Sequence, residues 1–359
     1  MKIDVKKLLK KCLLWIVSLA IFIVGYYFVY LYCGYQREIS PATLEITDKT
    51  EEKLPLGEEV SLMTFNIGFG AYSDDYSFFM DGGEYSRAFS LEAVNENMDG
   101  IISTVKANDP DILLLQEVDI KGTRSYNVDQ SELFLEKMDG YDSVFAVNYN
   151  SPYYLYPLKE PIGKNKSGIM TLSRYNIAYS TRWRLPVEDS LYKYLDLDRA
   201  YSVSMISTNG AALMLYNIHL SAYTSDGSIA DEQLKLLLED MKKEYEKGRY
   251  VIAAGDFNKD LLGDSSQYFE REEMNLVWTK PINSELIPEG ITLYAASNAP
   301  SCRNADSPYR GDGTDFVLTV DGMLASANVT VVSSENLDEG FKHSDHNPVK
   351  YTIILEKPN

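Results

Sequence analysis

Polar side chains that could bind a metal ion close two apolar runs in the N-terminal half of the sequence. Asn66 ends the run SLMTFN, and Glu117 follows DILLLQ, which would hold its carboxylate rigidly at the end of a strand. A hard cation such as Mg²⁺ prefers carboxylate and amide oxygens and keeps several water ligands. Glu117 is therefore the best single candidate for a metal ligand, although a carboxylate that only caps the next segment would give the same pattern.

Two later runs end in groups suited to proton transfer and to positioning water. His219 closes LMLYNIH, and the run AAGDFN carries Asp256 and Asn258 after Gly255, which permits a tight turn. Neither run is specific by itself. A histidine at a strand end is often only a hydrogen-bonding residue, and G-D-x-N turns are common for conformational reasons.

The last polar groups of this kind are Asp321, in LTVDGMLAS, and the pair Asp345 and His346, in HSDHNPVKYTI. The chain has only three histidines. Two of them, at 219 and 346, fall at strand ends beside acidic or amide groups, and imidazole transfers protons near neutral pH. The third, His343, is expected in an exposed loop. The distribution of histidines therefore favours a catalytic interpretation.

The order of these groups along the chain carries more information than any one of them. The ordered stretches are Asn66, Gln116–Glu117, Asn217–His219, Gly255–Asn258, Asp321 and Ser344–Pro348. Together with KSGIMTLSRYNI, they resemble the endonuclease/exonuclease/phosphatase superfamily over roughly residues 60 to 356. This resemblance implies an α/β (α+β) fold, a four-layered α-β-β-α sandwich with two facing mixed β-sheets, and a hydrolase that acts on phosphoric ester bonds.

The resemblance also implies one metal site for Mg²⁺, with Mn²⁺ as a possible substitute. Glu117 would be its principal ligand. Asn66 would assist the metal or the phosphate, and Asp345 would contribute directly or through water.

The remaining matched residues would act on water and phosphate. Asp256 would align the attacking water and Asn258 would donate to a phosphoryl oxygen, while His346, oriented by Asp321, would stabilise the growing negative charge or transfer a proton. His219 would face the same phosphate from the other side. A histidine at that position makes the chain look nearer to the deoxyribonuclease and sphingomyelinase branches.

Elements that could position these residues follow from hydrophobic periodicity. Two longer stretches, Leu91–Lys106 and Ile229–Lys247, have helical spacing and should pack on a sheet. Short apolar runs between turn signals predict strands at Val60–Phe65, Asp111–Gln116, Tyr141–Val147, Gly168–Leu172, Ile177–Arg184, Tyr201–Ser207, Ala212–Ile218, Tyr250–Ala254, Phe316–Leu324, Val329–Ser333 and Val349–Leu355. No repeat or second composition shift occurs, so we expect one catalytic domain over 59–359.

The N-terminal region predicts a membrane anchor. Residues 12–33 carry no charge and are long enough for a transmembrane helix, whereas a buried core helix or a cleaved signal peptide fits less well. Lysines dominate 1–11, so the positive-inside rule predicts a basic cytoplasmic N-terminus, and tyrosines cluster at the far end of the span. We expect a single-pass protein of the cell membrane, with a linker or stalk over 34–58 and an extracellular catalytic domain.

Composition limits the substrates. A formal net charge of -19 argues against strong electrostatic binding of long nucleic acid, because affinity for polyanions comes largely from Lys and Arg. With three cysteines, two of them in the apolar span, no intrachain disulfide framework is expected.

A phosphate-ester substrate remains open among a lipid headgroup, a nucleotide and a nucleic acid, and no protein partner is implied. The segments 69–90 and 299–313 fall outside the family pattern, so they either select the substrate or are ordinary surface insertions. The alternative functions are a surface-anchored binding or adhesion domain with the same fold but no catalysis, and an extracellular nuclease.

Overall fold

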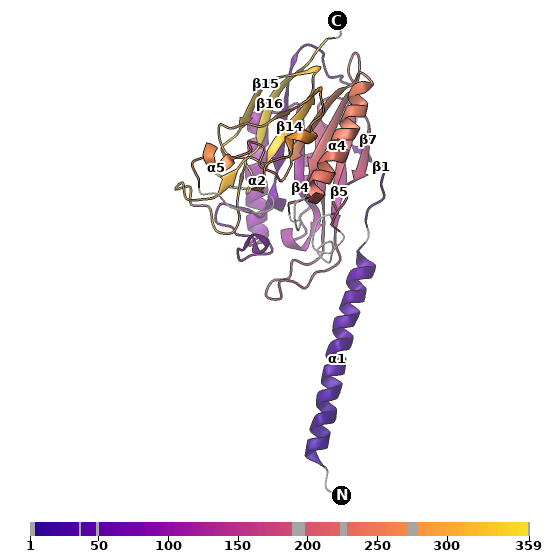
Figure 1. Cartoon of the computed structure of the whole chain (residues 1–359), viewed down its shortest axis with the longest axis vertical. Coiled ribbons are helices and arrows are strands. Elements are labelled where there is room, and N and C mark those ends of the chain that lie inside the picture. Colours follow the sequence, from indigo (N-terminus) through magenta and orange to yellow (C-terminus); the bar gives the residue numbers. More distant parts are fainter. Residues whose placement is uncertain are drawn as a thin grey trace.

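The computed structural model describes residues 4–35, 37–47, 50–188, 198–222, 228–271 and 279–357. A single long helix, α1 (Val5–Gly34), projects from one end of the folded domain, and the C-terminus lies at the opposite end (Figure 1). Within the described residues, α1 is the one helix long and apolar enough to cross a membrane, and its side chains are not buried by the domain.

The domain is built on two seven-stranded sheets in the described part of the chain. The first sheet has the order β1-β7-β8-β9-β10-β14-β11, and its strands are Ala42–Thr43, Ile177–Arg184, Ala200–Ile206, Leu213–His219, Tyr250–Asp256, Asp321–Ser326 and Ile291–Tyr294. The second has the order β15-β16-β3-β4-β6-β5-β2, with strands Val329–Asn336, Val349–Leu355, Glu59–Asn66, Ile112–Gly122, Asn165–Ser173, Asp142–Asn150 and Ile46–Thr47. A separate small pair joins β12 (Cys302–Arg303) to β13 (Val317–Leu318).

Side-chain alternation along the strands creates three apolar layers. Leu62 and Ile112 face the other sheet, whereas their neighbours Met63 and Leu113 face the opposite way, toward helix α2 (Leu91–Asn108). The period of two that strands impose therefore fills both sides of the second sheet. Helix α3 (Gln130–Lys137) covers the same face as α2.

Helix α4 (Ser228–Glu246) packs on the outer face of the first sheet through Leu234, Leu237 and Met241, which contact β9 and β10 residues in a third apolar cluster. A short helix, α5 (Ser265–Tyr268), contacts β13. The result is the predicted four-layered α-β-β-α sandwich of two mixed sheets, visible in Figure 1 as strands between α2 and α4.

The strand directions explain how distant residues meet. The central pairs β3/β4 and β9/β10 are parallel, so their carboxyl ends lie at the same edge of each sheet. The neighbouring strands β14 and β16 are antiparallel to β10 and β3, so they begin at that edge. One edge of the sandwich therefore collects four strand ends and the starts of two more strands.

The segment 34–58, expected to be a linker or stalk, packs against the domain at several points. β1 pairs with β7, β2 pairs with β5, and the side chain of Leu54 is fully buried between the sheets. Strands of two residues show no alternation long enough to recognise in a sequence. The strand predicted over Phe316–Leu324 is likewise two strands, β13 and β14, which belong to different sheets.

Candidate active site

All eight residues expected to do chemistry lie at or next to the edge where the strands converge. Asn66, His219 and Asp256 are the last residues of β3, β9 and β10. Asp256 is the register partner of His219 on one side and of Asp321, the first residue of β14, on the other. The two parallel pairs and their antiparallel neighbours thus bring together groups that are far apart in the sequence.

Glu117 owes its position to an irregularity in β4. The pairing of β4 with β6 shifts register between Leu115 and Val118, and Glu117 lies in this bulge with a φ of 55°. Bulges and left-handed backbone re-aim side chains and concentrate at functional sites. The Glu117 side chain is 22% exposed, and among the described residues none donates a hydrogen bond to its carboxylate. Burial raises the pKa of Glu117, and the nearby Asp345 carboxylate raises it further.

Asp256 is held by several donors. Its Oδ2 accepts from Nδ2 of Asn66 at 3.0 Å and from Nδ2 of Asn258 at 3.2 Å, and its Oδ1 accepts from the backbone N–H of Asn258 at 2.8 Å. Burial raises the pKa of Asp256 to about 7, against the opposing effect of His346. The carboxylate is therefore fixed in orientation and poised to exchange a proton near neutral pH.

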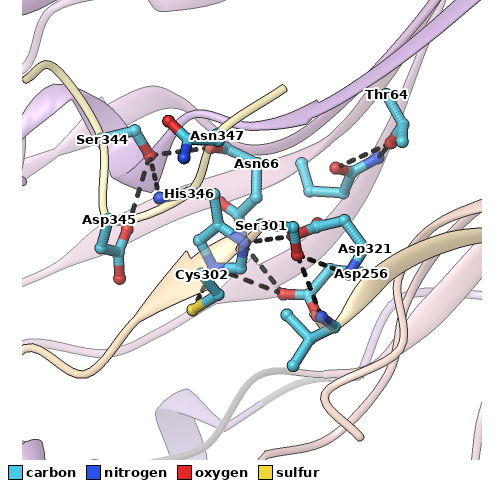
Figure 2. Close-up of polar contacts among 12 residues, drawn as sticks. Thr64, Asn66, Asp256, Ser301, Cys302, Asp321, Ser344, Asp345, His346 and Asn347 are labelled. Carbon is cyan, nitrogen blue, oxygen red and sulfur yellow. Dashed lines mark hydrogen bonds and ion pairs between the residues drawn. The ribbon is translucent and has the colours of Figure 1, made fainter. Parts of the chain in front are cut away.

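His346 forms a pair with Asp321 at the centre of Figure 2. The Nδ1 atom lies 2.7 Å from Oδ2 of Asp321, which also accepts from Oγ of Ser301 at 2.8 Å. Nε2 lies 3.6 Å from Sγ of Cys302 and 3.9 Å from Oδ2 of Asp256. Burial lowers the pKa of His346, but the charge and hydrogen bond of Asp321, together with Cys302, outweigh burial and raise the pKa well above its ordinary value. The Asp321 carboxylate therefore favours the charged imidazole.

The pKa of His219 is shifted in the opposite direction. Its Nε2 lies 3.5 Å from Oδ2 of Asp256 and 3.9 Å from Oε1 of Glu117. Burial lowers the pKa of His219 well below its ordinary value, and the positive charges of Arg199 and His346 lower it further. The pKa values of two imidazoles near one carboxylate are thus shifted in opposite directions, the kind of separation that distinguishes acid from base roles.

The loop that carries Asp345 and His346 is fastened to β3. Oγ of Ser344 donates to the backbone carbonyl of Asn66 at 2.8 Å and accepts from the backbone N–H of His346 (Figure 2). Gly68 lies against this loop, since a Cβ there would be 3.0 Å from Oδ1 of Asp345. Burial raises the pKa of Asp345, as it does for Glu117.

A cavity at the convergent edge connects these groups. It is lined by Tyr72, Asp81, Glu117, Arg199, His219, Ala222, Asp256, Asn258, Cys302, Arg303, Asp345 and His346. The segments 69–90 and 299–313, singled out in the sequence, supply Tyr72, Asp81 and the pair Cys302 and Arg303. Arg199 was missed. It immediately precedes β8 in a stretch without a recognisable motif, so no sequence signal pointed to it.

Arg303 lines the cavity, but its guanidinium is bonded to backbone carbonyls of the protein. Its NH2 group donates to the carbonyls of Ser73 and Tyr76, and NH1 donates to the carbonyl of Asn304. This buried arginine therefore joins the 299–313 segment to the 69–90 segment, and the two segments form one wall of the cavity.

The donor set fits a divalent cation. Among the described residues, one grouping of potential ligands is Glu117 with Asp345, which line the same cavity, and a second is Asp256, Asp321 and His346, whose ligand atoms lie within 4.8 Å of one another. In the second grouping the carboxylates already accept hydrogen bonds, and Asp321 is bonded to His346. Burial raises the pKa of Glu117 and of Asp345, and a hard cation bound by both carboxylates would favour their charged form.

A comparison with protein-family models decides the classification. The model described as "Endonuclease/Exonuclease/phosphatase family" matches residues 63–346, which contain every predicted site residue. The chain belongs to the endonuclease/exonuclease/phosphatase family. Membership in this family makes the chain a phosphoester hydrolase of a class that generally depends on a divalent metal.

Solved structures agree on the fold. An endonuclease/exonuclease/phosphatase from Beutenbergia cavernae has 18% identity and a TM-score of 0.59, over 83% of this chain and 72% of that one. ANGEL2, a 2′,3′-cyclic phosphatase in complex with adenosine-2′,3′-vanadate, has 16% identity and a TM-score of 0.55, over 89% of this chain and all of that one. D. rerio TDP2 with a single-strand DNA product has 15% identity and a TM-score of 0.51, over 82% and 99%. No curated protein matches the sequence.

Proposed function

We propose that this family member is a membrane-anchored phosphoesterase that hydrolyses a phosphodiester or phosphomonoester outside the cytoplasm, with Mg²⁺ or Mn²⁺, by in-line attack of water. The observation that carries the proposal is the constellation around Asp256. The buried Asp256 carboxylate lies near two imidazoles whose pKa values are shifted in opposite directions, and the partly buried carboxylates of Glu117 and Asp345 line the same cavity. Phosphoryl transfer requires a positioned nucleophile and positive charge around the phosphate.

Glu117 and Asp345 would hold the metal ion, with the side-chain Oδ1 of Asn66 as a third donor. That oxygen accepts from the backbone N–H of Gly68 at 3.1 Å, which fixes its direction. The ion would polarise a phosphoryl oxygen and offset developing negative charge.

Asp256 would orient the attacking water and accept its proton, since its pKa is raised to about 7 by burial. Asn258 differs from its expected role as a donor to the phosphoryl group. Its Nδ2 donates to the carbonyl of Leu220 at 2.9 Å and to Asp256, so both of its N–H groups have partners inside the protein. We therefore assign it the positioning of Asp256.

The two histidines would contact the phosphoryl group from different sides. His346, held by Asp321, would donate from Nε2 to an oxygen whose charge grows in the transition state, and it could pass that proton to the leaving oxygen. His219, which is neutral, would donate a hydrogen bond without adding charge. Both Nε2 atoms approach Oδ2 of Asp256, at 3.5 Å for His219 and 3.9 Å for His346, which supports a shared role at one phosphoryl group.

The location rests on α1 and its flanks. The lysine-rich residues 1–11 support a cytoplasmic N-terminus, which would place the catalytic domain outside the cell as a single-pass membrane protein.

The test uses the full-length protein in detergent micelles with a bis-aryl phosphodiester. We expect turnover with Mg²⁺ or Mn²⁺, none with a chelator, and a loss of about 10³-fold in kcat/KM for both Glu117→Gln and His346→Gln. In calorimetry, Glu117→Gln should lose divalent-metal binding while His346→Gln retains it. His343→Gln is the matched control, because His343 bonds Asn97 at 3.3 Å outside the cavity and should leave kcat/KM unchanged.

Activity that survives both substitutions would overturn the site. A well-folded protein that binds metal but hydrolyses no phosphate ester, whether aryl ester, lipid, nucleotide or single-stranded DNA, would favour the binding domain instead.

A further inference from the structure

The loop between β5 and β6 is attached to the membrane helix. The backbone N–H groups of Leu155 and Tyr153 donate to the hydroxyls of Tyr27 and Tyr30, each at 2.9 Å. Leu31 of α1 packs on the buried side chains of Tyr149, Tyr154 and Ile162 at the base of this loop. The end of α1 is therefore fixed against one particular loop of the catalytic domain.

The segment after α1 is fixed as well. Arg37 forms an ion pair with Asp198 and donates to the carbonyl of Leu185 at 2.7 Å, and the backbone N–H of Glu38 donates to Asp198 at 3.0 Å. A few residues later, β1 joins the edge of the first sheet. Because these contacts follow α1 so closely, the domain has a defined orientation relative to the helix axis.

The attached loop lies beside the apolar part of α1, not beyond its end. Tyr27 is seven residues before the last helical residue, Gly34, which corresponds to about 10 Å along the axis. At this level along α1, the loop exposes large apolar side chains: Leu158 is 85% exposed, Tyr156 59% and Leu155 45%. Tyrosine and leucine exposed at this level suit the interfacial layer of a bilayer.

The same loop lies at the catalytic edge. β4 and β5 both run antiparallel to β6, and Val118 of β4 and Val147 of β5 both face Gly168, so both strands end at one edge. The ring of Tyr156 contacts that of Phe79 at 5.8 Å between centroids. Two residues after Phe79, Asp81 lines the cavity. In Figure 1, α1 leaves the domain at this edge, opposite the C-terminal end of β16.

We propose that residues 153–158 form a second membrane contact, inserting Leu155, Tyr156 and Leu158 into the outer interfacial layer beside α1. The contact holds the catalytic edge toward the bilayer, so the enzyme acts on phosphate esters presented at the membrane surface. The occupant of this exposed apolar surface is the bilayer that α1 spans. This inference rests on the proposed function for the anchor and for the chemistry, and it adds the orientation of the site and the class of substrate.

The membrane contact can be tested without measuring activity. The full-length protein is reconstituted in phosphatidylcholine and phosphatidylglycerol liposomes with a benzophenone amino acid in place of Leu158 or, as the control, Leu236, which is 41% exposed on α4. We expect a lipid adduct at position 158 at least about tenfold above that at 236, because only the former lies within reach of acyl chains. Equal yields would overturn the inference.

The consequence for the substrate is tested with two triple variants. The loop variant combines Leu155→Ser, Tyr156→Ser and Leu158→Ser, and the control combines Leu236→Ser, Tyr268→Ser and Val332→Ser, which are exposed by 41%, 59% and 49%. In liposomes, the loop variant should lose about tenfold of its turnover of a fluorescent phospholipid, since the lost interfacial anchoring is worth at least about 1.4 kcal/mol. The control should keep that turnover.

Both variants should hydrolyse the bis-aryl ester in micelles at the wild-type rate, which also shows that they fold. Wild-type protein that cleaves the soluble ester but no liposomal phospholipid would overturn the inference and leave the proposed chemistry intact. A lipid adduct at 158 without hydrolysis of any ester would do the reverse: the chemistry would fail and the membrane contact would stand.

Discussion

His219 and His346 acquire different charges because their partners differ. Both side chains are buried, which by itself favours the neutral imidazole. His346 has Asp321 at 2.7 Å, whereas the charged neighbours that most affect His219 are Arg199 and His346, both positive. The division of roles between the two histidines therefore depends on one carboxylate.

Asp321→Asn should make His346 neutral. In the wild type the pKa of His346 is raised, so the stabilising ion pair is fully present below the unfolded pKa of about 6.5 and is lost as the pH rises through the folded pKa. Without the Asp321 charge, burial dominates and the pKa falls below 6.5. An NMR titration of His346 in metal-free protein measures the change directly.

The same substitution should lower kcat by about 10²- to 10³-fold at pH 7.5, with a smaller deficit at pH 5.5, where part of the imidazole is protonated. A deficit that does not change with pH would contradict the role of His346 as a cationic donor. Glu335→Gln, on β15, is a control for the loss of one carboxylate and should leave both measurements unchanged.

Gly255 is required for a different reason than a tight turn. It lies inside β10 with a φ of 148°, and a Cβ there would be 2.1 Å from the carbonyl oxygen of Ile218. Gly255→Ala should therefore destabilise the fold by about 3 kcal/mol and displace Asp256, the next residue.

Gly248→Ala provides the matched control, since Gly248 also has positive φ (79°) but no atom within 4 Å of the added Cβ. It should cost about 1 kcal/mol. Urea denaturation compares the two variants, and equal losses would show that the close approach of β9 is unimportant.

At the level of elements, the sequence predicted the long strands and helices well and the short ones poorly. Helix α4 runs over Ser228–Glu246, against a predicted Ile229–Lys247, because its apolar positions repeat over five turns. β1 and β2 contain two residues each and are held by edges of sheets whose positions depend on the whole fold. No local periodicity can report such tertiary pairing.

The same limit of local sequence patterns applies to the candidate site. The sequence predicts Glu117, Asp256 and His346 as site residues because each follows or precedes a recognisable apolar run. The sequence does not predict the bulge that turns Glu117 toward the cavity. It does not predict the position of Arg199 either. Both features arise from strand register and from packing between sheets, which involve residues far apart in the chain.

The segment that joins α1 to the first sheet depends on Asp198. This buried carboxylate bonds Arg182 at 3.3 Å and also pairs with Arg37, so its removal would leave two guanidinium groups without their counter-ion. Asp198→Ala should lower the free energy of unfolding by about 3 kcal/mol. Asp99→Ala breaks an exposed pair with Lys137 and should cost less than about 1 kcal/mol. Chemical denaturation that finds the two equal would contradict the attachment of this segment.

For the whole molecule, the attachment of the segment after α1 to the domain determines which experiment best tests the membrane topology. A flexible stalk would be an easy target for protease, but residues that pair in β1 and β2 are poor substrates. Chemical labelling of cysteine is better suited, because Cys12 and Cys33 lie in the apolar span and Cys302 is buried in the domain. The native thiols should therefore give little background.

We predict that a membrane-impermeant maleimide added to intact cells labels Val332→Cys but not Lys7→Cys. Val332 is exposed on β15 in the domain that we place outside, and Lys7 lies on the basic flank that the positive-inside rule keeps in the cytoplasm. Lys7→Cys should react only after the membrane is permeabilised, which shows that its thiol is available. The reverse pattern, with Lys7→Cys labelled in intact cells and Val332→Cys protected, would place the catalytic edge and its exposed apolar loop at the inner leaflet.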